Sequence, residues 1–171
     1  MNRSSNLLRI ALLCACILAV GCAMTPLAGV VPGSTTLDEL RGLAGEPRAR
    51  IDHAGGGATL YYSHQPYGRE NYAVRITNRG VVASVEGLLT VDNFAKIRVN
   101  ESTTSEVRTL LGPPNSVDRV ERKGHTAWEY WAWLNSVPMR VWISFSADDV
   151  VREVVRIDET PQLNTCPAPG C

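Results

Sequence analysis

The 171-residue sequence lacks the features that mark most enzymes, metal proteins and nucleic-acid-binding proteins. Its three histidines, His53, His64 and His125, are scattered and show no metal-ligand spacing. It contains no glycine-framed serine nucleophile, no phosphate-binding loop and no paired catalytic carboxylates. Seventeen basic residues balance seventeen acidic ones, whereas nucleic-acid binding requires a net basic face. We therefore expect no enzyme activity, no metal, no cofactor and no nucleic-acid partner.

Long apolar runs are also absent, except at the N terminus. Residues 10–20 form an uncharged apolar run that follows Arg3 and Arg9. The run is shorter than the roughly 20 residues that cross a bilayer, so it indicates a secretory signal peptide and not a membrane span. An alanine, a valine and a glycine then precede Cys22. We predict a signal peptide over residues 1–21.

The residues before Cys22 resemble the lipobox of bacterial lipoproteins. The resemblance implies cleavage before Cys22 and acylation of its thiol and its new amino group, although leucine is commoner where Ala19 stands. Buried acyl chains, at about 0.8 kcal/mol per CH₂, hold a protein durably on a membrane. Because Ala23 and not aspartate follows, the resemblance implies the periplasmic face of the outer membrane. The alternative is a secreted protein that is cleaved elsewhere.

Residues 90–114 carry the end signals of two short helices. Thr90 can cap the first helix, and Ser102, Thr103 or Thr104 can cap the second. Glu106 lies three residues after Thr103, which is the spacing of a capping box. An apolar stripe at helical spacing follows. Gly112 and two prolines then end the second helix, because glycine readily adopts positive φ and proline cannot continue a helix.

The same pattern occurs 67 residues earlier in the chain. At this constant interval the matched pairs are Leu40 and Val107, Arg41 and Arg108, Leu43 and Leu110, Gly45 and Gly112, Pro47 and Pro114, Tyr61 and Trp128, Val74 and Val141, Ile76 and Ile143, and Glu86 and Glu153. A register without insertions indicates a tandem repeat of one small unit. We expect the first copy to lack a counterpart of the helix at residues 90–97.

Alternating apolar residues and turn signals predict antiparallel strands after each helix. The expected strands are 48–52, 59–63, 72–77 and 81–89 in the first copy, and 117–121, 127–133, 139–145 and 150–157 in the second. The fold class is therefore α+β, with short helices packed on antiparallel meander sheets of three or four strands. The expected segments are the signal peptide 1–21, a tether 22–32, a first repeat 33–90, a second repeat 91–158 and a disordered tail 159–171, in which Cys166 and Cys171 can form a disulfide in the oxidising periplasm.

The sequence of a capped helix, a Gly-x-Pro end and a Trp-x-Tyr strand resembles the BamE (SmpA/OmlA) domain of outer-membrane lipoproteins. The resemblance is carried by Gly33, Thr36, Leu40, Leu43, Gly45 and Pro47 in the first copy, and by Thr103, Val107, Leu110, Leu111, Gly112, Pro114, Trp128 and Tyr130 in the second, where Asn100 replaces the glycine. It covers nearly the whole mature chain. It implies a small α+β lipoprotein domain that partners the outer-membrane protein assembly machinery.

The tandem arrangement departs from that family, whose assembly component usually has a single copy of the domain. Two copies of a similar unit resemble the secreted beta-lactamase inhibitor proteins, which grip an enzyme with an aromatic-rich sheet face. Two functions follow from these resemblances. The favoured one is a lipid-anchored protein-interaction module in outer-membrane protein assembly or envelope integrity. The alternative is a periplasmic binding inhibitor of a hydrolase such as a beta-lactamase.

Strand alternation predicts a cluster of tryptophans on one surface of the second sheet. Successive side chains of a strand point to opposite faces. The face opposite the helices is therefore expected to carry Trp131, Trp133 and Trp142, edged by Arg140 and Glu129. Clustered tryptophans beside an arginine are typical of a protein-binding hot spot. The alternative is that these rings pack against the first repeat, because small tandem units have thin cores.

Overall fold

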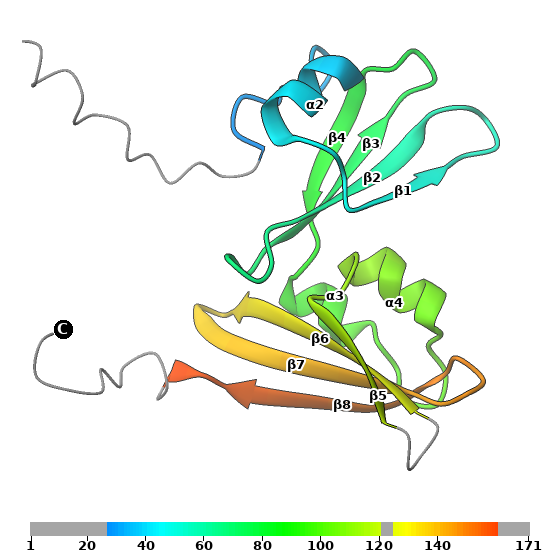
Figure 1. The fold of residues 1–171 in the computed structure, drawn as a ribbon, viewed down its shortest axis with the longest axis vertical. Coiled ribbons are helices and arrows are strands. Elements are labelled where there is room, and N and C mark those ends of the chain that lie inside the picture. Colours follow the sequence, from blue (N-terminus) through cyan, green and yellow to red (C-terminus); the bar gives the residue numbers. More distant parts are fainter. Residues whose placement is uncertain (1–26, 121–124, 161–171) are drawn as a thin grey trace, which may run out of the picture.

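The computed structural model describes residues 27–120 and 125–160, which form two α+β units in succession (Figure 1). The first unit contains α2 (Leu37–Ala44), β1 (Ala49–Asp52), β2 (Ala58–Ser63), β3 (Asn71–Ile76) and β4 (Val82–Gly87). The second contains α3 (Val91–Ala95), α4 (Thr104–Leu111), β5 (Ser116–Val120), β6 (His125–Leu134), β7 (Val137–Phe145) and β8 (Val151–Asp158). Each sheet has four antiparallel strands in chain order, so the predicted α+β class with meander sheets is confirmed.

Some of the predicted features lie outside the described residues. These are the signal peptide with Cys22, and the two cysteines of the tail, Cys166 and Cys171. Among the helices that are described, none is both long and apolar enough to cross a membrane.

The helix ends repeat from one unit to the other. The Thr36 and Thr103 hydroxyls each accept a hydrogen bond from the backbone N–H of the third residue of the helix that follows. That third residue is a glutamate in both cases, and its carboxylate accepts a bond from the threonine backbone N–H at 2.8 Å. Such a cap contributes about 1 kcal/mol. Gly45 and Gly112 end the two helices with φ of 74°. The helical part of the repeat therefore matches at the predicted interval.

The strands do not keep that interval. Tyr62 donates to the Gly45 carbonyl (3.3 Å) as Tyr130 donates to the Gly112 carbonyl (3.0 Å), so these two tyrosines are equivalent although they are 68 positions apart. The cause is the β5–β6 hairpin, which is one residue longer than the β1–β2 hairpin. A second extra residue lies between β6 and β7.

Four predicted strand matches are therefore wrong: Tyr61 with Trp128, Val74 with Val141, Ile76 with Ile143, and Glu86 with Glu153. Strand pairing makes Leu60, Val74, Ile76 and Val85 the counterparts of Trp128, Ile143, Phe145 and Val154. Both sheets also shift register at equivalent positions, after Arg75 and after Ser144. The repeat itself persists, because equivalent residues still face the helices.

Each unit buries its own apolar core between its helices and one face of its sheet. Leu27 and Val30, which the sequence assigns to the tether, pack against the first core. They stand 67 residues before Phe94 and Ile97, which pack against the second core. The first unit therefore begins before Gly33, and it retains the start of the repeat as a turn instead of a helix.

The two units meet where α4 ends against the first sheet, on the face opposite α2 (Figure 1). The buried Asn71 side chain donates to the carbonyls of Leu111 (2.7 Å) and Pro113 (2.9 Å). Gly112 fits closely here, since a Cβ at this position would lie 3.1 Å from Leu88. Tyr61 and Ala73 are buried on the same face. The centre of the outer face of the first sheet is therefore covered by the second unit, whereas Arg75 and Glu86 on the same face are exposed.

Candidate functional site

The second sheet keeps its outer face, and the predicted aromatic residues lie on it. Cross-strand pairs place Glu129 beside Trp142 and Trp131 beside Arg140, on the face opposite the helices. Trp133 follows on the same face, opposite Pro138. In contrast, Trp128 and Tyr130 point into the core, where Trp128 packs 4.7 Å from the Phe145 ring. The structure thus brings together all five residues of the predicted face, and their role in binding stays a prediction.

Strand β8 extends this face with two apolar residues that sequence reasoning missed. Val155 pairs with Trp142, and Ile157 pairs with Arg140. Trp133, Val155 and Ile157 are 49%, 37% and 41% exposed. We call Trp133, Trp142, Val155 and Ile157 the outer patch. Alternation along β8 is the signal that would have found the two added residues.

Two arginines alternate with the three tryptophans. The Arg140 guanidinium lies 5.0 Å from the Trp131 ring and 5.7 Å from the Trp142 ring. The Arg69 guanidinium lies 5.7 Å from the Trp131 ring and 5.5 Å from the Trp133 ring. These are cation–π distances. We call the series Trp133, Arg69, Trp131, Arg140 and Trp142 the tryptophan–arginine ladder.

Buried carboxylates neutralise the ladder. Glu159 accepts from Arg69 (2.7 Å) and from Arg140 (2.6 Å), and its side chain is only 5% exposed. Glu129 lies 3.5 Å from Arg140 and also accepts from the Asn115 amide at 2.8 Å. Glu159 belongs to the fold and not to a disordered tail, so the predicted tail boundary is too early. The reason is that Glu159 provides the carboxylate that two neighbouring arginines require.

Arg69 comes from the first unit, in the loop of residues 64–70 between β2 and β3. In Figure 1 this loop descends toward the β6–β7 hairpin. Strand β5 pairs β6 only as far as Glu129, and beyond that point the Trp131 amide donates to Gln65 Oε1 (3.1 Å). The loop therefore covers part of the β6 edge and Trp131, while the outer patch stays accessible. Trp131 therefore packs against the first unit, as one alternative predicts, whereas Trp133 is exposed, as the other predicts.

Other ionisable groups serve the fold. Burial raises the pKa of the Tyr130 phenol, whose hydroxyl donates to the Gly112 carbonyl. The His53 ring lies 2.9 Å from the Thr59 hydroxyl, and His64 lies 3.5 Å from Glu70. Within residues 27–120 and 125–160, no group of three histidine, cysteine, aspartate or glutamate side chains could hold a metal ion.

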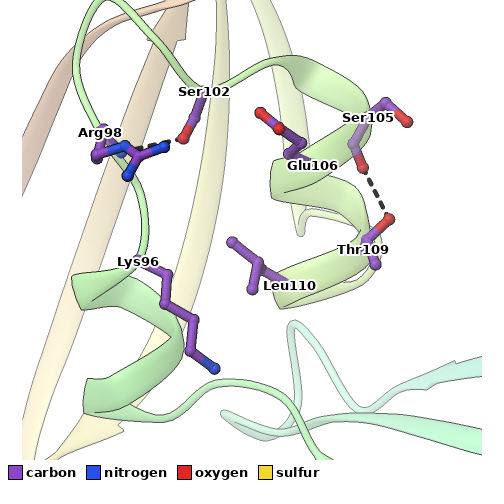
Figure 2. Close-up of a pocket in the computed structure, with 7 residues that line it drawn as sticks. All are labelled: Lys96, Arg98, Ser102, Ser105, Glu106, Thr109 and Leu110. Carbon is purple, nitrogen blue, oxygen red and sulfur yellow. Dashed lines mark hydrogen bonds between the residues drawn. The ribbon is translucent and has the colours of Figure 1, made fainter.

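Figure 2 shows a pocket of about 350 Å³ between the segment after α3 and helix α4. It is lined by Lys96, Arg98, Ser102, Ser105, Glu106, Thr109 and Leu110. Lys96 donates to Asn93 Oδ1 (2.9 Å), Arg98 pairs with Glu101 (2.7 Å), and Glu106 completes the α4 cap. The charged groups of this pocket therefore already have partners in the chain.

Comparison with known proteins yields two distant structural likenesses. A DUF4309 family protein (YjgB) of Bacillus subtilis is 15% identical, and the superposition gives a TM-score of 0.32. The match covers 79% of this chain and 86% of the Bacillus chain. A protein of Streptococcus mutans that is proposed to be a beta-lactamase inhibitor is 10% identical, with a TM-score of 0.30. The match covers 72% of this chain and 83% of the Streptococcus chain. No protein-family model matches the chain, and no curated protein matches it. Likenesses this distant carry no inference about function, and the BamE resemblance stays a prediction.

Proposed function

We propose that this chain is a non-catalytic protein-interaction module, held on the outer membrane by acylated Cys22, that docks a partner on the outer patch. The observation that carries the proposal is the exposure of Trp133, Val155 and Ile157 on a sheet face whose counterpart in the first unit is buried. Tryptophan is enriched among residues that dominate binding energy. Apolar residues gathered on one exposed face typically mark interaction sites.

The side chains of the outer patch are held in place, and the arginines beside them are paired, before a partner binds. Trp142 and Trp133 lie on paired strands, and the neighbouring arginines are already neutralised by Glu129 and Glu159. A partner that covers this face would therefore desolvate few unpaired charges. Aromatic side chains held by stacking also lose little conformational entropy on binding.

The docking test compares three purified mature domains as bait in a bacterial envelope extract. The variants are Trp142→Ala and the pair Val155→Ser with Ile157→Ser, and the matched control is Val117→Ser, an apolar residue 56% exposed away from the outer patch. We expect the first two to lose about tenfold or more of a specifically bound envelope protein, the size of a hot-spot loss. Equal retention by all three would contradict docking on this face.

The anchor is tested separately. Palmitate labelling of the full chain in an envelope-bearing host should be lost in Cys22→Ser and retained in Cys16→Ser. Labelling that survives Cys22→Ser would remove the membrane anchor from the proposal, and it would leave the docking face untouched.

The alternative function uses the same surface on a soluble target. Two consecutive sheet units, on which the resemblance to beta-lactamase inhibitors depends, could grip a periplasmic hydrolase. This function predicts a one-to-one complex and loss of hydrolase activity, weakened by Trp131→Ala or Trp142→Ala. Assembly or envelope function instead predicts co-purification with outer-membrane assembly proteins and a barrier defect on deletion.

A further inference from the structure

The environment of Arg69 has the composition of a guanidinium-binding site. Trp131 and Trp133 face its guanidinium at 5.7 and 5.5 Å. Its two terminal nitrogens donate to the Met139 carbonyl (3.1 Å) and to Glu159 Oε2 (2.7 Å). Two aromatic faces, a carbonyl and a buried carboxylate suit a planar, forked cation better than a compact ammonium. We call these four groups the slot.

All four groups of the slot belong to the second unit, whereas Arg69 belongs to the first. The slot is therefore filled by a loop from another module and not by its own sheet. Within that loop Tyr67 is 95% exposed, so the segment that carries Arg69 also reaches solvent. Bonds within the loop set its shape, and Gln65 and Arg69 hold it to the second unit through the hydrogen bonds with Trp131, Met139 and Glu159.

The contact between loop and slot leaves hydrogen-bond donors unpaired. Two of the buried side-chain donors without a partner in the described residues lie at this contact: Gln65 Nε2 and Trp131 Nε1. Gln65 is buried, since only 6% of the residue is exposed. A buried donor without an acceptor lowers stability. The loop is thus held by Arg69 and by the bond between Gln65 and the Trp131 amide, but two buried donors beside it stay unpaired, which lowers the free energy needed to displace it.

We propose that the slot is a guanidinium-binding site, that Arg69 fills it in the free chain, and that an arginine of a docking partner takes the place of Arg69. The second part rests on the proposed docking function. The slot adjoins the outer patch through Trp133, so an arginine-bearing loop laid on the patch reaches it directly. The exchange breaks the Arg69–Glu159 ion pair and forms the same pair with the partner, so charge stays balanced.

The slot is tested with Arg69→Ala and two matched probes, N-acetyl-arginine amide and N-acetyl-lysine amide. Binding is followed by tryptophan fluorescence and by the shift of the melting temperature. We expect the arginine probe to bind Arg69→Ala about tenfold more tightly than the lysine probe, because a planar guanidinium can lie against both tryptophan faces while its two terminal nitrogens donate to the carbonyl and the carboxylate. Adding Glu159→Gln should abolish the preference, and Arg79→Ala, at an exposed turn, should behave as wild type.

Equal binding of the two probes, or no binding, would overturn the site. If Arg69→Ala does not fold, Arg69→Gln, which keeps most of the aliphatic stem, replaces it in the same comparison. Exchange is tested on the unaltered chain, which should reach the same fluorescence end point at a higher concentration of the arginine probe, because the slot must first open. If the unaltered chain does not respond, Arg69 is not exchanged, and its pair with Glu159 is only an internal ion pair. Neither result depends on retention of an envelope protein, so failure of the docking proposal is recognised separately.

Discussion

The two units share helix caps, strand order and a register shift, yet their outer sheet faces differ. The first unit presents Tyr61 and Ala73, and these are buried against the second unit. The second unit presents the outer patch, in which Trp133, Val155 and Ile157 are exposed and Trp142 is half-buried. One unit therefore uses the centre of its outer face to join the other unit, whereas the other keeps most of its outer patch accessible. The difference shows that side chains that point away from the core can diverge while the core pattern is kept.

The hairpins differ in the same way. In the second unit β6 and β7 run on to a two-residue turn at Asn135 and Ser136, both with positive φ. In the first unit the equivalent hairpin is shorter, and residues 64–70 form the loop that reaches the slot. A regular hairpin in one copy is therefore a connecting loop in the other. Four sets of substitutions test how far the two units are equivalent.

The largest effect is expected at the joining face. Asn71→Ala removes the donor to two carbonyls at the end of α4 and should lower the free energy of unfolding by about 3 kcal/mol. Urea unfolding followed by circular dichroism measures it. Asn78→Ala, at an exposed turn, is the control and should change little. If Asn71→Ala lowers the free energy of unfolding no more than Asn78→Ala does, the two units do not stabilise each other through Asn71.

The two helix-ending glycines should differ. Both have φ of 74° and ψ near the extended region, at −162° and −167°, a combination that side chains with a Cβ avoid. Gly45→Ala should cost about 2 kcal/mol from this strain alone. Gly112→Ala should cost roughly 1 kcal/mol more, because the new methyl group crowds Leu88. Equal losses in thermal unfolding would show that Leu88 gives way freely.

Tyr130→Phe and Tyr62→Phe compare the hydrogen bond from each sheet to its helix end. Tyr130 is fully buried and its bond is 3.0 Å, whereas the Tyr62 bond is 3.3 Å at a partly buried site. We expect a loss of about 1.5 kcal/mol for Tyr130→Phe and about 0.5 kcal/mol for Tyr62→Phe. Urea midpoints of the two variants decide it, and a larger loss at Tyr62 would contradict the ranking.

The smallest expected difference is at the caps. Thr36→Ala and Thr103→Ala each remove a threonine of a complete capping box, so both should cost about 1 kcal/mol. Glu39→Gln is a useful companion, because the bonds to Thr36 hold the pKa of the Glu39 carboxyl below its usual value. Stability from this carboxylate is present at neutral pH and is lost as the pH falls through that lowered pKa. A pH-independent loss for Glu39→Gln would argue against the charged cap.

Much of the fold could be predicted because its signals are local. The caps at Thr36 and Thr103 act over three residues, and the alternation that places Trp131 and Trp142 on one face acts over two. The sheet register between copies could not be predicted, because a constant interval hides single extra residues in two hairpins. Leu27 and Val30 were missed because a turn can present apolar residues to a core without helical spacing.

The two α+β units, their helix ends and the strand residues that face the core follow from local sequence patterns. These features depend on hydrogen bonds and side-chain directions between residues that are near in sequence, and the same local patterns occur in both units. The packing of the two units sets which outer face is covered, and it places Arg69 between tryptophans of the other unit, where it pairs with Glu159, 90 residues away. A contact at that separation leaves no periodic trace in the sequence, because it depends on how two finished units pack.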